Sequence, residues 1–310
     1  GECAPGFPRC SYPEDLFFDR APLRHVNATS DVANGSWFFD YDRRRILFAD
    51  DPTGRLVETS VARRAFGNPR SAPAADVTVA DLSVFGYAIP AQMGAVGGQY
   101  PGPRWAVEGV TAVLNHGAGV SIMDGGAVRA SNLSLNGQQG VKAGGPGCLV
   151  AGNAIARNNY AGFLTGWEAG GGKFWATTGL VVRGNTVSSN VGAGLWCDGS
   201  CLGATFEGNV VFGNTNDGIK YEISFGAVVK NNTACNNGLG KDAWLWGSDI
   251  LVQNSRDSVV EGNFVVVGAA AGNGIGLIQQ SRGNGTGPGF GPHLTLNNTV
   301  ANNTVVFAAG

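Results

Sequence analysis

Two carboxylates occupy the same place in neighbouring repeats of the sequence. The segments Gly-Leu-Trp-Cys-Asp and Gly-Ile-Lys-Tyr-Glu end at Asp198 and Glu222 and align without a gap. If Leu195 and Ile219 point inwards, the alternation of a β-strand turns Asp198 and Glu222 outwards. Stacked strands lie about 4.8 Å apart, so the two carboxylates are expected roughly 5 Å from each other.

That spacing indicates a particular chemistry. Retaining glycosidases place two carboxylates about 5–5.5 Å apart, whereas inverting enzymes leave roughly 6.5–9.5 Å for a water molecule. Two close carboxylates also push their pKa values apart, so that one stays ionised as nucleophile and the other stays protonated as general acid. The simpler alternative is that both are solvated surface acids that happen to align.

The glycine that opens this strand can be aligned in successive repeats, and the alignment shows how many repeats have a carboxylate at the position of Asp198 and Glu222. The aligned glycines are Gly119, Gly140, Gly162, Gly194 and Gly218. Four positions later the residues are Met123, Gly144, Gly166, Asp198 and Glu222. Only two consecutive repeats therefore carry a carboxylate at this position.

The repeat itself is marked by asparagine. One Asn recurs at Asn132, Asn153, Asn185, Asn209, Asn232 and Asn298, and a second follows at Asn136, Asn158, Asn190, Asn214, Asn237 and Asn303. Val110 and Asn115 stand at these places one repeat earlier. Most steps are 21 to 24 residues, but Asn153 to Asn185 is 32 and Asn232 to Asn263 is 31. A period of this length with short strands is typical of a solenoid.

Composition agrees with a β-solenoid. The chain has 310 residues with 50 Gly and 13 Pro, 43% hydrophobic and 14% charged. Glycine without a three-residue period excludes collagen, the apolar content argues against disorder, and glycine disfavours helical bundles. Gly and Asn accept the left-handed backbone of tight corners, and stacked Asn side chains form hydrogen-bonded ladders. We predict an all-β, right-handed parallel β-helix.

The first part of the chain lacks the repeat. Residues 37–41 and 46–48, joined across 42–45, predict a β-hairpin that ends near the Asp-Pro-Thr-Gly turn at 51–54. A solenoid needs a cover at its open end. We therefore divide the chain into an N-terminal β-hairpin cap, residues 1–72, and a parallel β-helix catalytic domain, residues 73–310.

The two long repeats flank the carboxylate pair. Their extra residues are expected at 165–175, with Trp167, Glu168, Lys173 and Trp175, and at 239–249, with Lys241, Asp242, Trp244 and Trp246. Solenoid insertions emerge as loops, and tryptophan faces stack on the C–H faces of sugars. The predicted substrate-binding residues are Trp196, Trp167, Glu168, Lys220, Trp244, Trp246, Gln253 and Gln279.

The two carboxylate segments resemble a known family. Gly-Leu-Trp-Cys-Asp and Gly-Ile-Lys-Tyr-Glu-Ile-Ser are similar to the catalytic segments of glycoside hydrolase family 120, β-helical retaining β-xylosidases, best over residues 150–240. The resemblance implies Asp198 as nucleophile and Glu222 as acid/base. That family carries an additional β-sandwich domain for which this chain has no room. The expected function is a retaining glycoside hydrolase acting on terminal or short-chain glycosides.

Two other functions fit the same pattern. A polysaccharide lyase or uronate epimerase needs a base such as Lys220, Tyr221 or Lys241 and a group that neutralises the substrate carboxylate. Strand alternation turns Tyr221 inwards, and two carboxylates repel an anionic polymer. A non-catalytic carbohydrate-binding protein could use the Trp residues as a sugar platform.

Charge and cysteine content set the remaining expectations. The net charge is −2 with no basic run, so we expect a carbohydrate partner and neither nucleic acid nor membrane. The three His and six Cys do not have the spacing of a metal site, and we expect no cofactor. The spacings of Cys3 to Cys10 and Cys197 to Cys201 favour local disulfides, leaving Cys148 and Cys235 as a long-range pair or two thiols.

Disulfides and glycosylation motifs favour a secreted glycoprotein. Sequons occur at Asn27, Asn34, Asn132, Asn231, Asn284, Asn297 and Asn302. The sequence does not predict an oligomeric state.

Overall fold

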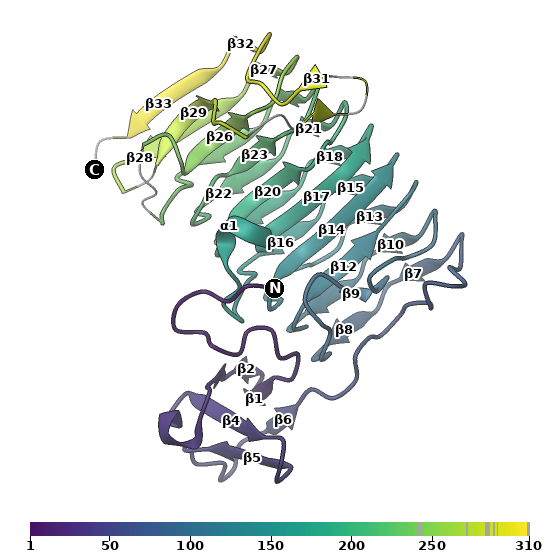
Figure 1. Ribbon diagram of the computed structural model, residues 1–310, viewed down its shortest axis with the longest axis vertical. Helices are drawn as coiled ribbons and strands as arrows, with labels where there is room; N and C mark the ends of the chain where they lie inside the picture. The colour runs from purple at the N-terminus through teal and green to yellow at the C-terminus, as the bar shows by residue number, and fades with distance from the viewer. Residues whose placement is uncertain (241–243, 271, 283–285, 288, 290, 309–310) are drawn as a thin grey trace.

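Three parallel sheets run the length of most of the molecule and wrap around one core (Figure 1). The computed structural model describes residues 1–240, 244–270, 272–282, 286–287, 289 and 291–308. Lys241, Asp242 and Asn284 lie outside these residues. Each coil contributes one strand to each sheet in turn, as β18, β19 and β20 do in the middle of the chain. The predicted parallel β-helix is confirmed.

Sheet A carries the carboxylate segments. In the described part of the chain it has eight strands, paired in parallel in this order: β9 (Gly94–Val96), β12 (Ala118–Ile122), β14 (Gln139–Pro146), β17 (Gly170–Thr178), β20 (Ala193–Asp198), β23 (Ile219–Glu222), β26 (Ser248–Gln253) and β29 (Asn273–Ile278).

Sheets B and C complete each coil. The strands of sheet B are β7 (Thr78–Ala80), β10 (Ala106–Glu108), β13 (Ala127–Arg129), β15 (Leu149–Ala151), β18 (Val181–Arg183), β21 (Thr205–Glu207), β24 (Val228–Lys230), β27 (Val259–Glu261) and β32 (Thr299–Ala301). Those of sheet C are β8 (Ser83–Phe85), β11 (Thr111–Val113), β16 (Ala154–Ala156), β19 (Thr186–Ser188), β22 (Val210–Phe212), β25 (Thr233–Cys235), β28 (Phe264–Gly268) and β33 (Thr304–Ala308). Isolated bridges through Asn132 connect β11 to β16.

The core is built from the inward-facing residues of the strands, one from most strands of sheets B and C and two from strands of sheet A such as β20 and β23. In one coil, Val182, Val187 and Leu195 come from the three sheets, and all are fully buried in a single cluster that continues from coil to coil. Because period-2 alternation buries every second side chain, the residues beside them face outwards.

Two asparagine ladders hold the corners. Asn185 Nδ2 donates to Asn209 Oδ1 (2.9 Å) and to Val150 O (3.0 Å), and Asn190 Nδ2 donates to Asn214 Oδ1 (2.8 Å) and to Ile155 O (3.0 Å). The first ladder runs through Asn153, Asn185, Asn209, Asn232, Asn263 and Asn303, and the second through Asn115, Asn136, Asn158, Asn190, Asn214, Asn237 and Asp249.

The sequence alignment of the ladders was wrong at both ends. Ser131, and not Asn132, stands beside Asn153, because the Ser131 amide donates to Asn153 Oδ1 (3.0 Å) while its hydroxyl accepts from the Val110 amide (3.0 Å). A serine oxygen thus replaces the asparagine oxygen. Asn303 stacks on Asn263 in the first ladder (2.9 Å), so it is not the second-ladder partner of Asn298.

The N-terminal strands form separate small sheets, drawn in purple below the coils in Figure 1. The elements are β1 (Leu16–Phe18), β2 (Ala21–Pro22), β3 (Arg24–His25), η1 (Thr29–Asp31), β4 (Ser36–Asp40), β5 (Arg45–Phe48) and β6 (Val57–Thr59). Strands β4 and β5 pair antiparallel, which confirms the predicted hairpin.

A buried polar cluster docks this segment on the coils. Both carboxylate oxygens of Asp15 lie 3.1 Å from His116 Nδ1, Tyr160 donates to Asp15 Oδ2 (2.8 Å), and His116 Nε2 donates to Cys10 O (2.7 Å). Asp15 raises the pKa of His116 against the effect of burial. The Ala65 amide continues the contact by donating to Ala95 O of the first coil (3.0 Å).

Both predicted local disulfides are present. Cys3 pairs with Cys10 and Cys197 with Cys201, while Cys148 and Cys235 are free thiols, the first buried and the second half-buried. The six sequon asparagines in the described residues are exposed, whereas the ladder asparagines are buried, except for half-buried Asn303. Among the described residues there is no helix long and apolar enough to cross a membrane.

Candidate functional site

The carboxylate strands lie side by side in the expected register. On β20 and β23, Leu195 pairs with Ile219 and Cys197 with Tyr221, and these four side chains are fully buried in the core. Asp198 and Glu222 are the next residues of the two strands. The predicted alternation therefore holds, and both carboxylates leave the outward face of sheet A.

The residues stacked beside the pair differ from the sequence alignment. Strand β17 places Trp175 beside Asp198 and Lys173 beside Trp196, where the alignment had put Gly166 at the first of these positions. The extra residues of this coil come before β17, as a loop and the short helix α1 (Thr165–Glu168). Lys173 and Trp175 thus belong to the strand and not to the inserted loop.

Asp198 is held by a buried lysine. Lys173 Nζ lies 2.7 Å from Asp198 Oδ2, and the lysine side chain is only 4% exposed whereas that of Asp198 is 27% exposed. Burial lowers the pKa of Lys173 to about 8, and the attraction of Asp198 opposes that shift. Lys173 therefore loses its proton around pH 8, well below the pH at which a surface lysine does.

Glu222 receives three donors. Lys220 Nζ lies 3.1 Å from Glu222 Oε2, Trp196 Nε1 donates to the same oxygen (3.1 Å), and Arg282 forms an ion pair with Oε1. The Glu222 side chain is only 6% exposed. These contacts fix both oxygens of a nearly buried carboxylate.

Trp196 connects the two carboxylates. It stands in register between Lys173 on β17 and Lys220 on β23. The two ammonium nitrogens lie 2.9 Å and 4.5 Å from its ring centroid. Since an indole face attracts cations, the ring lets two lysines sit close together with less mutual repulsion. Trp196 is buried and braces the carboxylates, which differs from an open sugar platform.

The turn after Asp198 is fixed covalently. Gly199 and Ser200 both have left-handed φ angles, +66° and +69°, and the Cys197–Cys201 disulfide closes the turn around them. The disulfide sulfur of Cys197 lies in the core. Asp198 therefore projects from a corner that is anchored from both sides.

A cavity of about 350 Å³ opens beside Glu222. Four predicted site residues line it, namely Glu222, Lys220, Trp246 and Gln253. Gln253 pairs with Glu222 in register, and Lys220 Nζ lies 5.5 Å from the Trp246 ring. The remaining lining residues are Gly166, Asn216, Asp217 and Arg282.

Trp167 and Glu168 lie on α1, whose Gly166 reaches this cavity. Trp167 is 37% exposed. The Glu168 backbone carbonyl accepts from Gln138 (2.7 Å) and Gln139 (2.9 Å), which ties α1 to β14 and the turn before it. Glu168 Oε2 is buried without a partner among the described residues, and Glu168 acts to raise the pKa of Lys173.

Two predicted binding residues have other surroundings. Trp244 is 65% exposed, and its carbonyl accepts from Asn273 Nδ2 (3.0 Å). Gln279 is exposed and its amide bonds Gln280 O and the Thr295 amide. It is Gln280 that reaches Gln253, through an Nε2 to Oε1 hydrogen bond of 3.0 Å.

Three basic residues of the site were not predicted as site residues. An alignment of Gly171, instead of Gly162, with Gly194 would have identified Lys173, because it places this lysine beside Trp196. Arg282 and His293 come from the segment around β30 (Thr286–Gly287) and β31 (Gly291–Pro292), which has no repeat pattern. Burial and, to a lesser extent, Arg282 lower the pKa of His293, and Asp198 opposes this shift.

The fold and sequence define the class of protein. The chain belongs to the right-handed β-helix family, since residues 102–257 match the family described as "Right handed beta helix region". No curated protein sequence matches the chain.

Two solved structures align with the chain. A structure of XylC in complex with xylose aligns with a TM-score of 0.65 and 14% identity, covering 86% of this chain and 51% of that one. The Dettilon tailspike protein aligns with a TM-score of 0.48 and 16% identity, covering 75% of this chain and 54% of that one. This chain spans about half the length of either structure. At 14% identity, the likeness to XylC is one of fold.

Proposed function

We propose that the chain is a retaining glycoside hydrolase with Asp198 and Glu222 as its catalytic pair. The observation that carries the proposal is their position: successive coils of sheet A present one carboxylate each, at the ends of strands in register. Glu222 lines the cavity, and Asp198 lies on the neighbouring strand outside its lining. The resemblance of the two segments to glycoside hydrolase family 120 supports the same assignment.

In the first step of this proposal, an Asp198 oxygen attacks the anomeric carbon while Glu222 protonates the departing oxygen. The bond from carbon to Asp198 forms as the glycosidic bond breaks. In the second step, Glu222 removes a proton from water, the water oxygen replaces Asp198 on the same carbon, and the configuration is retained. Lys173 orients Asp198 Oδ2 throughout.

Glu222 needs to lose a cation partner before it can act as an acid. Arg282 is the partner that can move, because its side chain is 39% exposed and it lies outside the regular coils, whereas Lys220 is 13% exposed on β23. Substrate that enters the cavity displaces Arg282 from Glu222 in this proposal.

The cavity suits a terminal or short-chain glycoside. Trp246 offers an aromatic face, and Gln253 supplies an amide beside Glu222. The partner we propose is therefore a carbohydrate. The two disulfides and the exposed sequon asparagines support secretion and glycosylation as parts of the same proposal.

Aryl glycosides test this function. Xyloside, arabinofuranoside, galactoside and glucoside are incubated with wild type, Asp198→Asn and Glu222→Gln, and phenol release is followed. We expect release from at least one substrate by wild type and little by either variant. Azide added to Asp198→Gly is expected to restore turnover and give an inverted glycosyl azide. A retained azide from Glu222→Gly would support Glu222 as the acid/base, and an inverted one would reverse the roles.

A lyase or epimerase acting on polyuronates is the second candidate. Lys173 favours it, because a lysine with a pKa of about 8 is a suitable base, and Lys220 and Arg282 could neutralise a substrate carboxylate. Tyr221 is not available as the base, since it is fully buried and donates to Cys201 O and Phe225 O. Lys241 lies outside the described residues.

A glycosidase and a lyase give different products. A lyase yields an unsaturated uronate that absorbs in the ultraviolet, and its rate rises with pH through about 8 as Lys173 loses its proton. A glycosidase yields no such absorbance. Sugar binding without any turnover would leave the third function, a non-catalytic carbohydrate-binding protein.

A further inference from the structure

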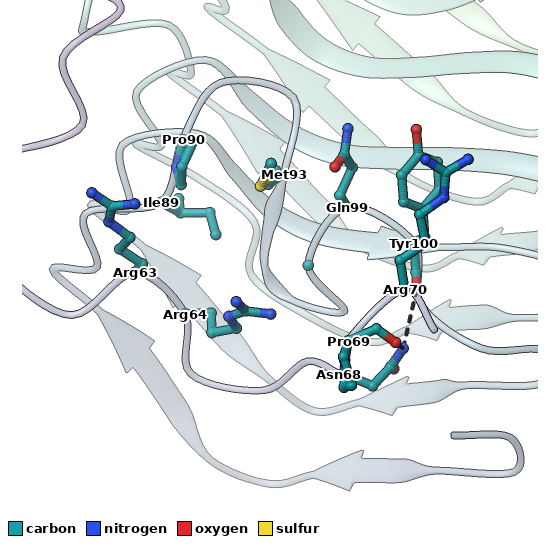
Figure 2. Close-up of a pocket in the computed structure, with 11 residues that line it drawn as sticks. Arg63, Arg64, Asn68, Pro69, Arg70, Ile89, Pro90, Met93, Gln99 and Tyr100 are labelled. Carbon is teal, nitrogen blue, oxygen red and sulfur yellow. Dashed lines mark hydrogen bonds between the residues drawn. The ribbon is translucent and has the colours of Figure 1, made fainter. Parts of the chain in front are cut away.

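A second cavity lies at the other end of sheet A. It has a volume of about 300 Å³ and is lined by residues 63–70 before the first coil and by residues 89–100 around β9 (Figure 2). Strand β9 is five strands away from β23, which carries Glu222, and this corresponds to about 24 Å at about 4.8 Å per strand. This cavity is therefore distinct from the one beside Glu222.

Three arginines line it. Arg63, Arg64 and Arg70 all contribute to the wall, and in the described part of the chain no carboxylate forms an ion pair with any of them. The protein as a whole has more acidic than basic residues, 23 against 21, so an unpaired cluster of this kind is a local feature. Three uncompensated guanidinium groups around one cavity favour an anionic ligand.

Two of the arginines come from opposite walls of the cavity. Figure 2 shows Arg64 extending from one wall towards the middle of the cavity, with Arg70 and Tyr100 on the opposite wall. The Arg70 guanidinium carbon lies 4.8 Å from the Tyr100 ring centroid. Stacking orients a guanidinium while leaving its N–H edge free for a carboxylate or sulfate.

The rest of the lining is neutral and mixed. Asn68 Nδ2 donates to Tyr100 O (3.3 Å), but Asn68 Oδ1 is buried without a hydrogen-bond partner among the described residues. A buried acceptor without a donor is costly, and a ligand hydroxyl supplies one. Pro90 and Met93 add partly exposed apolar surface on which the C–H face of a sugar ring can pack.

We propose that this cavity binds an acidic sugar, with its carboxylate or sulfate on Arg64 and Arg70 and a hydroxyl on Asn68 Oδ1. A simple inorganic anion uses the charges but leaves Asn68 and the apolar surface unused. A neutral sugar leaves the arginines unpaired. The ligand that uses all three features carries one negative group on a polyhydroxylated ring.

Binding is tested by ligand-observed NMR titration of the whole chain at low ionic strength. The probes are glucuronate, galacturonate and glucose 6-sulfate, with glucose, sulfate and phosphate for comparison. We expect the acidic sugars to bind more tightly than all three comparison compounds, and added salt to weaken them. Preference between the carboxylate and sulfate probes identifies the charged group. Equal binding of glucose, sulfate or phosphate would overturn the proposal.

Variants locate the site and separate it from the proposed reaction. Arg64→Gln and Arg70→Gln should each weaken binding about tenfold or more, whereas Arg45→Gln, an exposed arginine on β5, should leave it unchanged. Glu222→Gln should bind as wild type does even when it turns nothing over. If Arg282→Gln weakens binding and Arg64→Gln does not, the acidic sugar occupies the other cavity and the proposal is wrong. Thermal unfolding of each variant verifies that it is folded.

Discussion

Residues at equivalent positions of successive coils form stacked columns, and two such columns differ in a way that distinguishes the scaffold from the candidate site. In the corner column, every coil from Asn115 to Asn237 presents the same residue, and each amide is fully bonded to the next coil. In the sheet A column, the residues are Gly144, Trp175, Asp198, Glu222 and Gln253, and no two are alike.

The identical residues of the corner column and the different residues of the sheet A column have different physical consequences. A ladder of identical amides satisfies every donor and acceptor, because each Nδ2 donates to the Oδ1 above or below it. A column that places charges on adjacent strands must bring in counter-ions, and Lys173, Lys220 and Arg282 supply them. Stability alone does not call for buried charges at these positions, since replacing ion pairs with apolar residues is often neutral or stabilising.

The largest expected effect is on turnover. Asp198→Asn and Glu222→Gln should each reduce kcat by roughly 10²–10⁴-fold, because each removes a group that makes or breaks a bond or moves a proton. Glu207→Gln is the matched control, since Glu207 lies on sheet B and pairs at the surface with Lys230 (3.3 Å). Steady-state assays on the preferred aryl glycoside measure the difference. If Glu207→Gln loses as much activity, the catalytic role is not specific to the sheet A carboxylates.

The next effect concerns the ladder. Asn190→Ala deletes two donated and two accepted hydrogen bonds at a fully buried position, so the free energy of unfolding should fall by about 3 kcal/mol. Asn132→Ala, an exposed asparagine, should change it by less than about 0.5 kcal/mol. Urea unfolding compares the two; similar losses would show that the ladder contributes nothing special.

Lys173 gives a smaller, pH-dependent effect. Its pKa is about 8 in the folded protein against 10.5 for a free lysine side chain, so between these pH values the unfolded chain binds the extra proton. The free energy of unfolding should therefore rise as pH increases from about 8 to 10.5, by on the order of 2 kcal/mol. Lys173→Met should remove this contribution, and an unchanged slope in the variant would contradict the lowered pKa of buried Lys173.

The smallest effect is at Asp249, where the second ladder ends in a carboxyl. Asn237 Nδ2 donates to Asp249 Oδ1 (2.6 Å), and burial raises the pKa of Asp249 to about 6. The folded state binds the proton more tightly, so stability should fall as pH rises from about 4 to 6. Asp249→Asn should stabilise the protein at pH 7 by on the order of 1 kcal/mol and not at pH 4. A loss at pH 7 would mean that the charge is needed.

The fold could be predicted from the sequence because its signals are periodic. The Asn and Gly corners give the length of a coil, and strand alternation gives the inward residues, as Leu195 and Ile219 illustrate. The predicted register of Asp198 and Glu222 followed from the same period.

The errors came where the period breaks. The length of a long coil does not show whether its extra residues lie before or after the strand. For this reason the sequence alignment placed Gly166 beside Asp198, where the structure has Trp175. A serine can replace a ladder asparagine, so Ser131 went unrecognised. Arg282 and His293 come from an aperiodic segment. The ion pair of Arg282 with Glu222 depends on tertiary folding and has no counterpart in the repeat spacing.

The stereochemistry of the first product tests the central claim most directly. Wild-type protein is mixed with its preferred aryl glycoside in an NMR tube, and the anomeric proton of the newly released sugar is followed before mutarotation. The two-carboxylate mechanism predicts that the sugar appears first with the configuration of the substrate. An inverted sugar, or an unsaturated product in place of a free sugar, would contradict it.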